Sequence, residues 1–380
     1  MKITIDTAKL TELTDIATRF IAKNATLPIL QNIYIKASID SLIIRATDME
    51  KYIEIETPCT VASEGAITVN GKTFSDFMRT IEEQTLEISA DETTHIMTVK
   101  TTKDTIEING IAANEYVALP EIPQENKISV DIHAFSKGIE KVEYAVTEKN
   151  FSPVLTGVLI KYNPETSDKL TFVGTDSFRL AEFKAPSSKH EKSFSLIIPK
   201  ISITDVQRIA EYARGKGTEE LSIQYSENLI SFQCMVDSTR LLATSLLIQG
   251  NFPDYDREEI VPRSFNTTII VDKTLCEKAI KKIGILTRDI NNFIQIETSN
   301  DSIVITSGKT DKGAGTTSIP AIIEGENVSL GINGKYITDF IRLIEGEEMI
   351  FNIVDNHKPL ILIDKNDGSY KYVVRPLINN

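Results

Sequence analysis

Lysine and arginine side chains recur at matching places in three segments of this chain, and they are the side chains best suited to contact phosphate. The segments are residues 70–82, 199–211 and 333–345. In the first segment Lys72, Asp76 and Arg79 are spaced i, i+4, i+7, which puts both cations on one exposed face of a helix. Such a face can neutralise a phosphate backbone, or it can be a row of ion pairs in solvent.

Residues that could catalyse a reaction or bind a metal are scattered along the chain. The four histidines form no HxxxH or HExxH pattern, and the three cysteines have no CxxC spacing. We therefore expect no metal site, no disulfide framework and no cofactor. These residues are His95, His133, His190, His357, Cys59, Cys234 and Cys276.

Two alternatives to contact with a phosphate backbone stay open from the residues. Ser307-Gly308-Lys309-Thr310 resembles the end of a phosphate loop, although Ile303 stands where the first glycine of that loop is required. One alternative is therefore a nucleotide-binding enzyme with its site near Gly308, Lys309 and Thr310. The other is an adaptor that does not bind DNA and uses a triplicated scaffold.

The chain is acidic overall, but its charge is unevenly distributed. The formal net charge of −13 argues against a uniformly basic surface. Six predicted helical windows are nevertheless net positive when taken together: residues 7–24, 71–83, 132–150, 200–216, 273–288 and 334–346. If these helices line one surface, they form a locally positive wall in an acidic protein, with its strongest cluster at Lys278, Lys281 and Lys282.

The elements that must position these cations repeat as whole domains. A strand ending in aspartate precedes a helical pattern at residues 2–6, 127–131 and 268–272. The spacing of the copies is too long for a solenoid repeat and fits a small domain. We predict domains at residues 1–124, 125–262 and 263–380, each of the α+β class with two helices against antiparallel sheets. No apolar run is long enough for a membrane helix, and we expect a cytoplasmic protein.

Four motifs stand in order on this repeated frame: residues 27–30, 175–181, 251–255 and 372–377. With them the whole chain resembles the bacterial sliding-clamp family, the β subunit of DNA polymerase III. The resemblance implies three tandem DNA-clamp domains, a head-to-tail homodimer that forms a six-domain ring, and helices around double-stranded DNA. It also implies a non-catalytic processivity factor, which tethers the replicative polymerase and also binds the clamp loader and repair polymerases.

The resemblance further implies a pocket for short apolar peptides between the second and third domains. Apolar walls would hold the peptide, and a few polar groups would orient it. Phe178 stands where some members carry histidine, and the loop at residues 256–260 is longer than in the relatives. The matching positions are Leu155, Thr175, Arg179, Leu180, Pro253, Arg257, Asn333, Tyr336, Val373, Arg375, Pro376 and Leu377.

Two more sets of residues follow from the same resemblance. Positions that match or neighbour the DNA-facing surface are Lys23, Lys72, Arg79, Lys149 and Lys200. Positions that match the dimer contact are Ile106, Ile108, Ile285 and Leu286. Apolar residues exposed at a sheet edge favour association, although these four residues could also be ordinary core.

Overall fold

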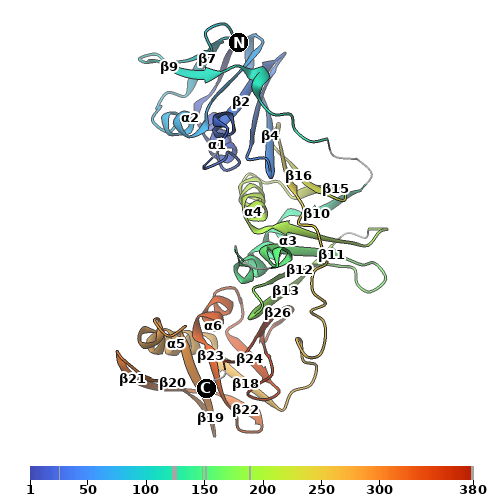
Figure 1. Cartoon of the computed structure of the whole chain (residues 1–380), viewed down its shortest axis with the longest axis vertical. Coiled ribbons are helices and arrows are strands. Elements are labelled where there is room, and N and C mark those ends of the chain that lie inside the picture. The colour runs from blue at the N-terminus through green and yellow to red at the C-terminus, as the bar shows by residue number, and fades with distance from the viewer. Residues whose placement is uncertain (25, 122–125, 148, 150–151, 188–189, 378–380) are drawn as a thin grey trace. The chain divides into compact units, whose positions relative to one another are not determined.

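A computed structural model describes the 380-residue chain except for residues 25, 122–125, 148, 150–151, 188–189 and 378–380. The chain divides into two compact units, whose helices and strands are labelled in Figure 1 where there is room. Unit 1 comprises Met1–Ser136 and Ile201–Ile248, and unit 2 comprises Lys137–Lys200 and Gln249–Asn380. The boundary predicted between residues 124 and 125 lies outside the described residues, and the three-domain division stays a prediction.

Unit 1 is built on a 13-stranded antiparallel sheet in the order β10-β15-β16-β17-β4-β3-β2-β6-β9-β8-β7-β1-β5. Apolar and polar residues alternate in β1, which buries Ile3 and Ile5. The strands are β1 (Lys2–Asp6), β2 (Asn32–Ser38), β3 (Ser41–Thr47), β4 (Lys51–Pro58), β5 (Thr60–Ser63), β6 (Gly65–Asn70), β7 (Thr85–Asp91), β8 (Ile96–Lys100), β9 (Thr105–Ile111), β10 (Lys127–Asp131), β15 (Glu220–Tyr225), β16 (Leu229–Val236) and β17 (Thr239–Leu246).

Unit 2 contains two antiparallel sheets. The 9-stranded sheet has the order β14-β11-β12-β13-β26-β25-β24-β18-β22, and the 4-stranded sheet has the order β21-β20-β19-β23. The strands are β11 (Gly157–Tyr162), β12 (Lys169–Thr175), β13 (Arg179–Pro186), β14 (Phe194–Pro199), β18 (Thr267–Asp272), β19 (Phe293–Ser299), β20 (Ser302–Thr310), β21 (Gly313–Pro320), β22 (Ile322–Gly325), β23 (Ser329–Asn333), β24 (Glu348–Ile353), β25 (Leu360–Asp364) and β26 (Asp367–Val374).

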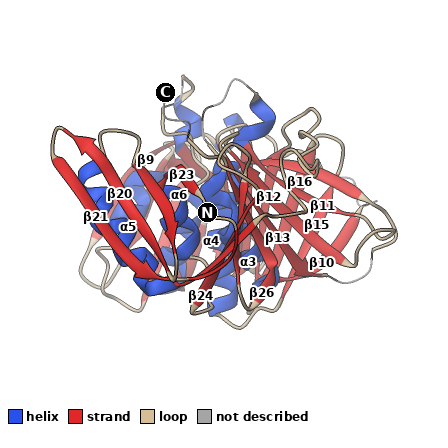
Figure 2. Cartoon of the chain, turned by 90° about the horizontal axis from the view of Figure 1, so that it is seen from below, coloured by secondary structure: helices blue, strands red, loops and turns tan. Residues whose placement is uncertain are grey.

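The helices confirm the predicted pairing of two helices with each set of strands. They are α1 (Thr7–Ala17), α2 (Gly71–Met78), α3 (Ile132–Val142), α4 (Lys200–Gly215), α5 (Lys273–Thr287) and α6 (Gly334–Ile341), with short 3-10 turns at η1 (Pro28–Gln31), η2 (Ala113–Glu115), η3 (Glu143–Ala145) and η4 (Pro153–Thr156). Figure 2 shows α5 lying across β20 and β21. The class is therefore α+β, as the sequence predicts.

Side-chain caps explain why each repeat turns from strand to helix. Asp6, Asp131 and Asp272 end their strands and accept hydrogen bonds from backbone N–H groups in the first turn of α1, α3 and α5, at 2.8, 2.6 and 2.7 Å. Asn70 and Asn333 cap α2 and α6 in the same way. The helices end before the predicted windows do. Helix α2 closes at the C-cap residue Arg79, and α3 passes into η3.

The segment that resembles a phosphate loop is part of a β-hairpin. Gly308, Lys309 and Thr310 belong to β20, and the pairing of β20 with β21 shifts register between Thr306 and Lys309. A phosphate loop must lead directly into a helix whose N-terminal N–H groups face the phosphates. Strand β21 follows instead, so the geometry does not favour the nucleotide-binding alternative.

Candidate functional site

A cavity of about 540 Å³ lies in unit 2, beside the pairing of β13 with β26. Its size falls in the usual range for ligand pockets. Its walls come from η4, the turn between β12 and β13, residues 252–260, the turn between β24 and β25, and the end of β26. The lining residues are Leu155, Thr175, Ser177, Phe178, Arg179, Leu180, Phe252, Pro253, Tyr255, Glu259, Ile260, His357, Lys358, Pro359, Val373 and Arg375.

The structure brings most of the predicted pocket residues together around this cavity. Those that line it are Leu155, Thr175, Arg179, Leu180, Pro253, Val373 and Arg375. Leu155, Leu180 and Val373 are buried and give the cavity an apolar wall. Because β13 and β26 pair Leu180 with Val373, strand register alone places these two residues side by side.

The remaining predicted residues lie outside the lining set. Arg257 is exposed and pairs with Asp254 at 3.0 Å. Asn333 caps α6, and Tyr336 stacks on the Arg179 guanidinium with 4.6 Å between the guanidinium carbon and the ring centre. Leu377 forms a backbone bridge to Gly331 and lines a different cavity, beside Lys309. Pro376 is partly exposed next to Arg375.

Several lining residues were not predicted: Ser177, Phe178, Phe252, Tyr255, Glu259, Ile260, His357, Lys358 and Pro359. Phe252 and Tyr255 lie within a recognised motif, and Ser177 and Phe178 lie within another, so the sequence contained a signal for these four. The turn at His357–Pro359 carries no motif. It reaches the cavity only because β25 pairs with β26.

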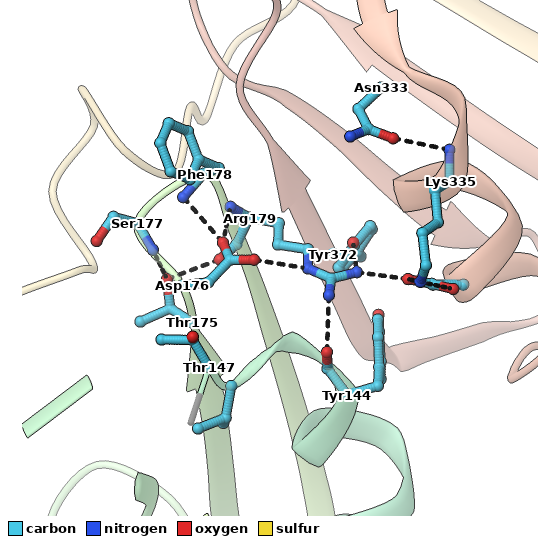
Figure 3. Close-up of polar contacts among 12 residues, drawn as sticks. Tyr144, Thr147, Thr175, Asp176, Ser177, Phe178, Arg179, Asn333, Lys335 and Tyr372 are labelled. Carbon is cyan, nitrogen blue, oxygen red and sulfur yellow. Dashed lines mark hydrogen bonds and ion pairs between the residues drawn. The ribbon is translucent and has the colours of Figure 1, made fainter. Parts of the chain in front are cut away.

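Arg179 lines the cavity, and its guanidinium bonds to three groups that do not line it (Figure 3). Its Nε donates to Asp176 at 3.0 Å, one terminal nitrogen donates to Asp339 at 2.7 Å, and the other donates to the Tyr144 carbonyl at 2.8 Å. Burial would lower the pKa of Arg179, but the hydrogen bonds to Tyr372 and Asp339 and the charge of Asp176 outweigh it and raise the pKa above its usual value. Burial has the opposite effect on Tyr372: it raises the pKa of that hydroxyl, which therefore stays neutral.

The residues predicted to face DNA differ in how free their cations are. Lys23 and Lys72 are exposed and form no ion pair within the described part of the chain. Arg79 is exposed, and the hydrogen bond from its guanidinium to Asp15 at 2.8 Å raises its pKa. Lys149 is exposed, whereas the partly buried Lys200 donates to the Val146 carbonyl at 2.7 Å.

The residues predicted for the dimer contact lie on β9 and on α5. Ile106 is 36% exposed on β9, whereas Ile108 on the same strand is buried. Ile285 on α5 is 57% exposed, and Leu286 lies against Gly315 of β21. Two of the four residues are therefore available at the surface of a single chain, and Ile108 belongs to the core of its own unit.

Among the described residues, no group of histidine, cysteine, aspartate and glutamate could hold a metal ion. Burial raises the pKa of the Cys234 and Cys276 thiols to about 12, so neither is a reactive thiolate. None of the helices in the described part of the chain has the length and apolar character needed to cross a bilayer.

Comparisons with known proteins agree along the whole chain. Family models described as the N-terminal, central and C-terminal domains of the DNA polymerase III beta subunit match residues 1–120, 129–254 and 258–378. The chain is 27% identical to the beta sliding clamp of Bacillus subtilis over 389 residues, covering 99% of both chains. It is 26% identical to that of Staphylococcus aureus over 380 residues, covering 97% of this chain and 96% of the relative.

Solved structures agree as well. The crystal structure of the Bacillus subtilis clamp superposes with a TM-score of 0.92 over the full length of both chains, at 27% identity. A Pseudomonas aeruginosa clamp bound to griselimycin superposes with a TM-score of 0.89, at 22% identity and also over the full length of both chains.

Proposed function

The chain belongs to the DNA polymerase III beta subunit family of sliding clamps, and we propose that two copies close head to tail into a ring around double-stranded DNA. Its function is that of a non-catalytic DNA sliding clamp. The proposed ring contains six domains, three from each chain, with the boundaries at residues 1–124, 125–262 and 263–380. Its proposed location is the cytoplasm.

The observation that carries the proposed ring is a strand pairing that occurs twice within the chain and, among the described residues, leaves one strand of each kind without such a partner. Strand β4 pairs with β17 in unit 1, and β13 pairs with β26 in unit 2. Strands β4 and β13 each end a run of three consecutive strands, β2-β3-β4 and β11-β12-β13. Strands β17 and β26 each end a second kind of run, β15-β16-β17 and β24-β25-β26. The remaining run of the first kind is β19-β20-β21, and the remaining run of the second kind is β7-β8-β9. The strands that end them are β21 and β9.

Both remaining strands have an open edge. Strand β21 ends the 4-stranded sheet, and Thr105–Asn109 of β9 pair only with β8 within the described residues. Unpaired edges are templates for association, and a heterologous contact that closes gives a ring. We infer that β21 of one chain pairs with β9 of a second copy, with Ile106 and Ile285 covered in the process.

The proposed DNA contact is electrostatic and independent of sequence. Lysine and arginine side chains contact phosphates without reading bases, so they suit a ring that must slide. The proposed DNA-facing residues are Lys23, Lys72, Arg79, Lys149 and Lys200. Persistence on DNA then comes from the closed ring, and tight binding of phosphate is not required.

The cavity in unit 2 is the proposed docking site for partner peptides. Its apolar wall suits short peptides with apolar anchors, and such peptides would come from the replicative polymerase, the clamp loader and repair polymerases. The proposed contacts are the predicted set Leu155, Thr175, Arg179, Leu180, Pro253, Arg257, Asn333, Tyr336, Val373, Arg375, Pro376 and Leu377. Griselimycin, which a Pseudomonas aeruginosa clamp binds, is a ready probe for this cavity.

Retention on circular DNA tests the proposed ring directly. The purified protein should have about twice the 42.3 kDa mass of one chain. Once loaded on circular DNA by a clamp loader, it should remain bound through gel filtration and should be released when a restriction enzyme linearises the DNA. Equal retention on circular and linear DNA would contradict a sliding ring, and a monomeric mass would contradict the dimer.

Replacing Phe178 with alanine tests the proposed pocket. Phe178 lines the cavity and is 57% exposed, so the substitution should remove ligand contact at little cost in folding stability. We expect griselimycin to bind roughly tenfold more weakly, the effect of losing one aromatic anchor contact worth about 1.4 kcal/mol. Titration calorimetry would measure it. The matched control is Met235→Ala, a 46% exposed residue of β16 in unit 1, which should leave affinity unchanged.

A further inference from the structure

Two turns in the chain share one hydrogen-bond pattern, one in each unit. The Thr47 hydroxyl donates to the Lys51 carbonyl at 2.9 Å, and the Thr175 hydroxyl donates to the Arg179 carbonyl at 2.6 Å. The residue two positions after each threonine has a left-handed backbone: φ is 80° at Met49 and 77° at Ser177. A side-chain-bearing residue in this conformation is strained, so the surroundings must hold each turn in place.

Each turn ends in a cation that reaches an aspartate on a helix. Lys51 pairs with Asp205 of α4, and Arg179 pairs with Asp339 of α6. The two aspartates occupy the same place in the repeated helical segment. Each cation also donates to a backbone carbonyl near a helix end, Lys51 to Arg19 at 2.7 Å and Arg179 to Tyr144 at 2.8 Å.

Asp48 and Asp176 each accept two backbone N–H bonds within their turns, but among the described residues only Arg179 also donates from its side chain back to the aspartate of its own turn. Asp176 accepts from Arg179 Nε through one carboxylate oxygen. Its other oxygen accepts from the backbone N–H groups of Phe178 at 3.0 Å and Arg179 at 2.9 Å (Figure 3). A continuous set of charge-assisted hydrogen bonds thus runs from α6 through Arg179 and Asp176 to the turn.

This set of bonds ends at the wall of the cavity. Ser177 and Phe178 line the cavity, whereas Asp176 and Asp339 are absent from its lining. The guanidinium of Arg179 directs all three of its nitrogens toward groups behind the wall, so little of its hydrogen-bonding capacity is left for a ligand.

We propose that Asp339 is a positioning residue for the peptide pocket: it fixes Arg179, and through Asp176 it holds the strained turn that presents Ser177 and Phe178 to the ligand. The inference rests on the proposed peptide-binding role of the cavity. The Lys51–Asp205 pair in unit 1 likewise joins a turn cation to a helix aspartate. A variant of that pair therefore separates a loss of positioning from a general loss of stability.

The test compares Asp339→Asn with its counterpart Asp205→Asn. We expect Asp339→Asn to bind griselimycin roughly tenfold more weakly, which corresponds to about 1.4 kcal/mol, and Asp205→Asn to bind like the wild type. Asp339→Glu, which keeps a carboxylate, should bind more tightly than Asp339→Asn. Hydrogen exchange at the Ser177 and Phe178 amides should become faster in Asp339→Asn and should stay unchanged in Asp205→Asn.

Two results would overturn the proposed role of Asp339. Wild-type affinity and unchanged amide exchange in Asp339→Asn would overturn it, and equal weakening in both asparagine variants would show a structural role only. If Asp339→Asn does not fold, Asp176→Asn breaks the same set of bonds nearer the surface and should weaken binding in the same direction. Failure of the wild-type protein to bind griselimycin would instead overturn the proposed pocket, and this inference with it.

Discussion

Replacing Lys51 with alanine is expected to lower the free energy of unfolding of unit 1 by about 3–5 kcal/mol, because it leaves a buried carboxylate without a partner. The side chains of Lys51 and Asp205 are 4% and 10% exposed, and their contact joins the start of β4 to the middle of α4. Lys51 also donates to the Arg19 carbonyl and lies 5.2 Å from the centre of the Phe20 ring. The substitution therefore removes a charge pair, a hydrogen bond and packing together.

Controls separate the buried pair from ordinary surface charge. The chain contains no tryptophan, so unfolding in urea is best followed by circular dichroism. Lys2→Ala breaks the pair with Glu87 at 3.0 Å, where both side chains are over one third exposed, and it should cost at most about 1 kcal/mol. The double variant Lys51→Ala/Asp205→Ala should recover part of the loss, since no unpaired charge stays buried. A cost for Lys51→Ala no larger than that for Lys2→Ala would contradict this account.

The sequence predicts the helices well because their local signals agree. Aspartate ends a strand and then caps the helix that follows, so one residue marks both elements. The predicted C-terminal ends of the helices lie beyond the observed ones, because apolar spacing continues past the last helical turn. Phe20 fits the period of α1 and is fully buried, yet α1 ends at Ala17 and a turn brings Phe20 into the core.

The candidate site is predictable only where its residues belong to local motifs. The turn at residues 175–179 and the end of β26 could be recognised in the sequence, whereas the turn at His357–Pro359 depends on the pairing of β25 with β26. The bond from Lys200 to the Val146 carbonyl likewise depends on η3, and spacing along α4 does not indicate it. A single sequence does not show which distant strands pair or in which register.

The two strand junctions within the chain also indicate what the proposed junction between chains lacks. The Thr310 hydroxyl donates to the Gly313 carbonyl at 2.8 Å, as Thr47 and Thr175 do to the last residues of their turns. By strand register Thr310 pairs with Gly313 as Thr47 pairs with Tyr52 and Thr175 with Leu180, so Lys312 stands where Lys51 and Arg179 do. Lys312 pairs with Asp289. The Lys312–Asp289 pair is exposed, whereas the pairs of Lys51 and Arg179 are buried, so the proposed contact between chains must depend more on apolar burial at β9, β21 and α5.

Replacing Ile285 with aspartate should therefore convert the proposed dimer to monomers at micromolar concentration. Ile285 is 57% exposed in the single chain, so the substitution should leave the fold intact. Covering an isoleucine contributes about 1.5–3 kcal/mol, and burying an unpaired carboxylate in its place adds a further cost. Together these effects should raise the dissociation constant at least about 100-fold. Sedimentation equilibrium would measure the change.

A control at a second isoleucine decides whether this effect is local to the proposed contact. Ile322 on β22 is 55% exposed and lies in the same unit, but in a different sheet from β21. Ile322→Asp introduces the same charge at nearly the same exposure and should leave the dimer intact. If both variants dissociate, net charge and not the β21 edge would control association. If neither dissociates, Ile285 does not lie in the contact, and the pairing of β21 with β9 would lose its main apolar support.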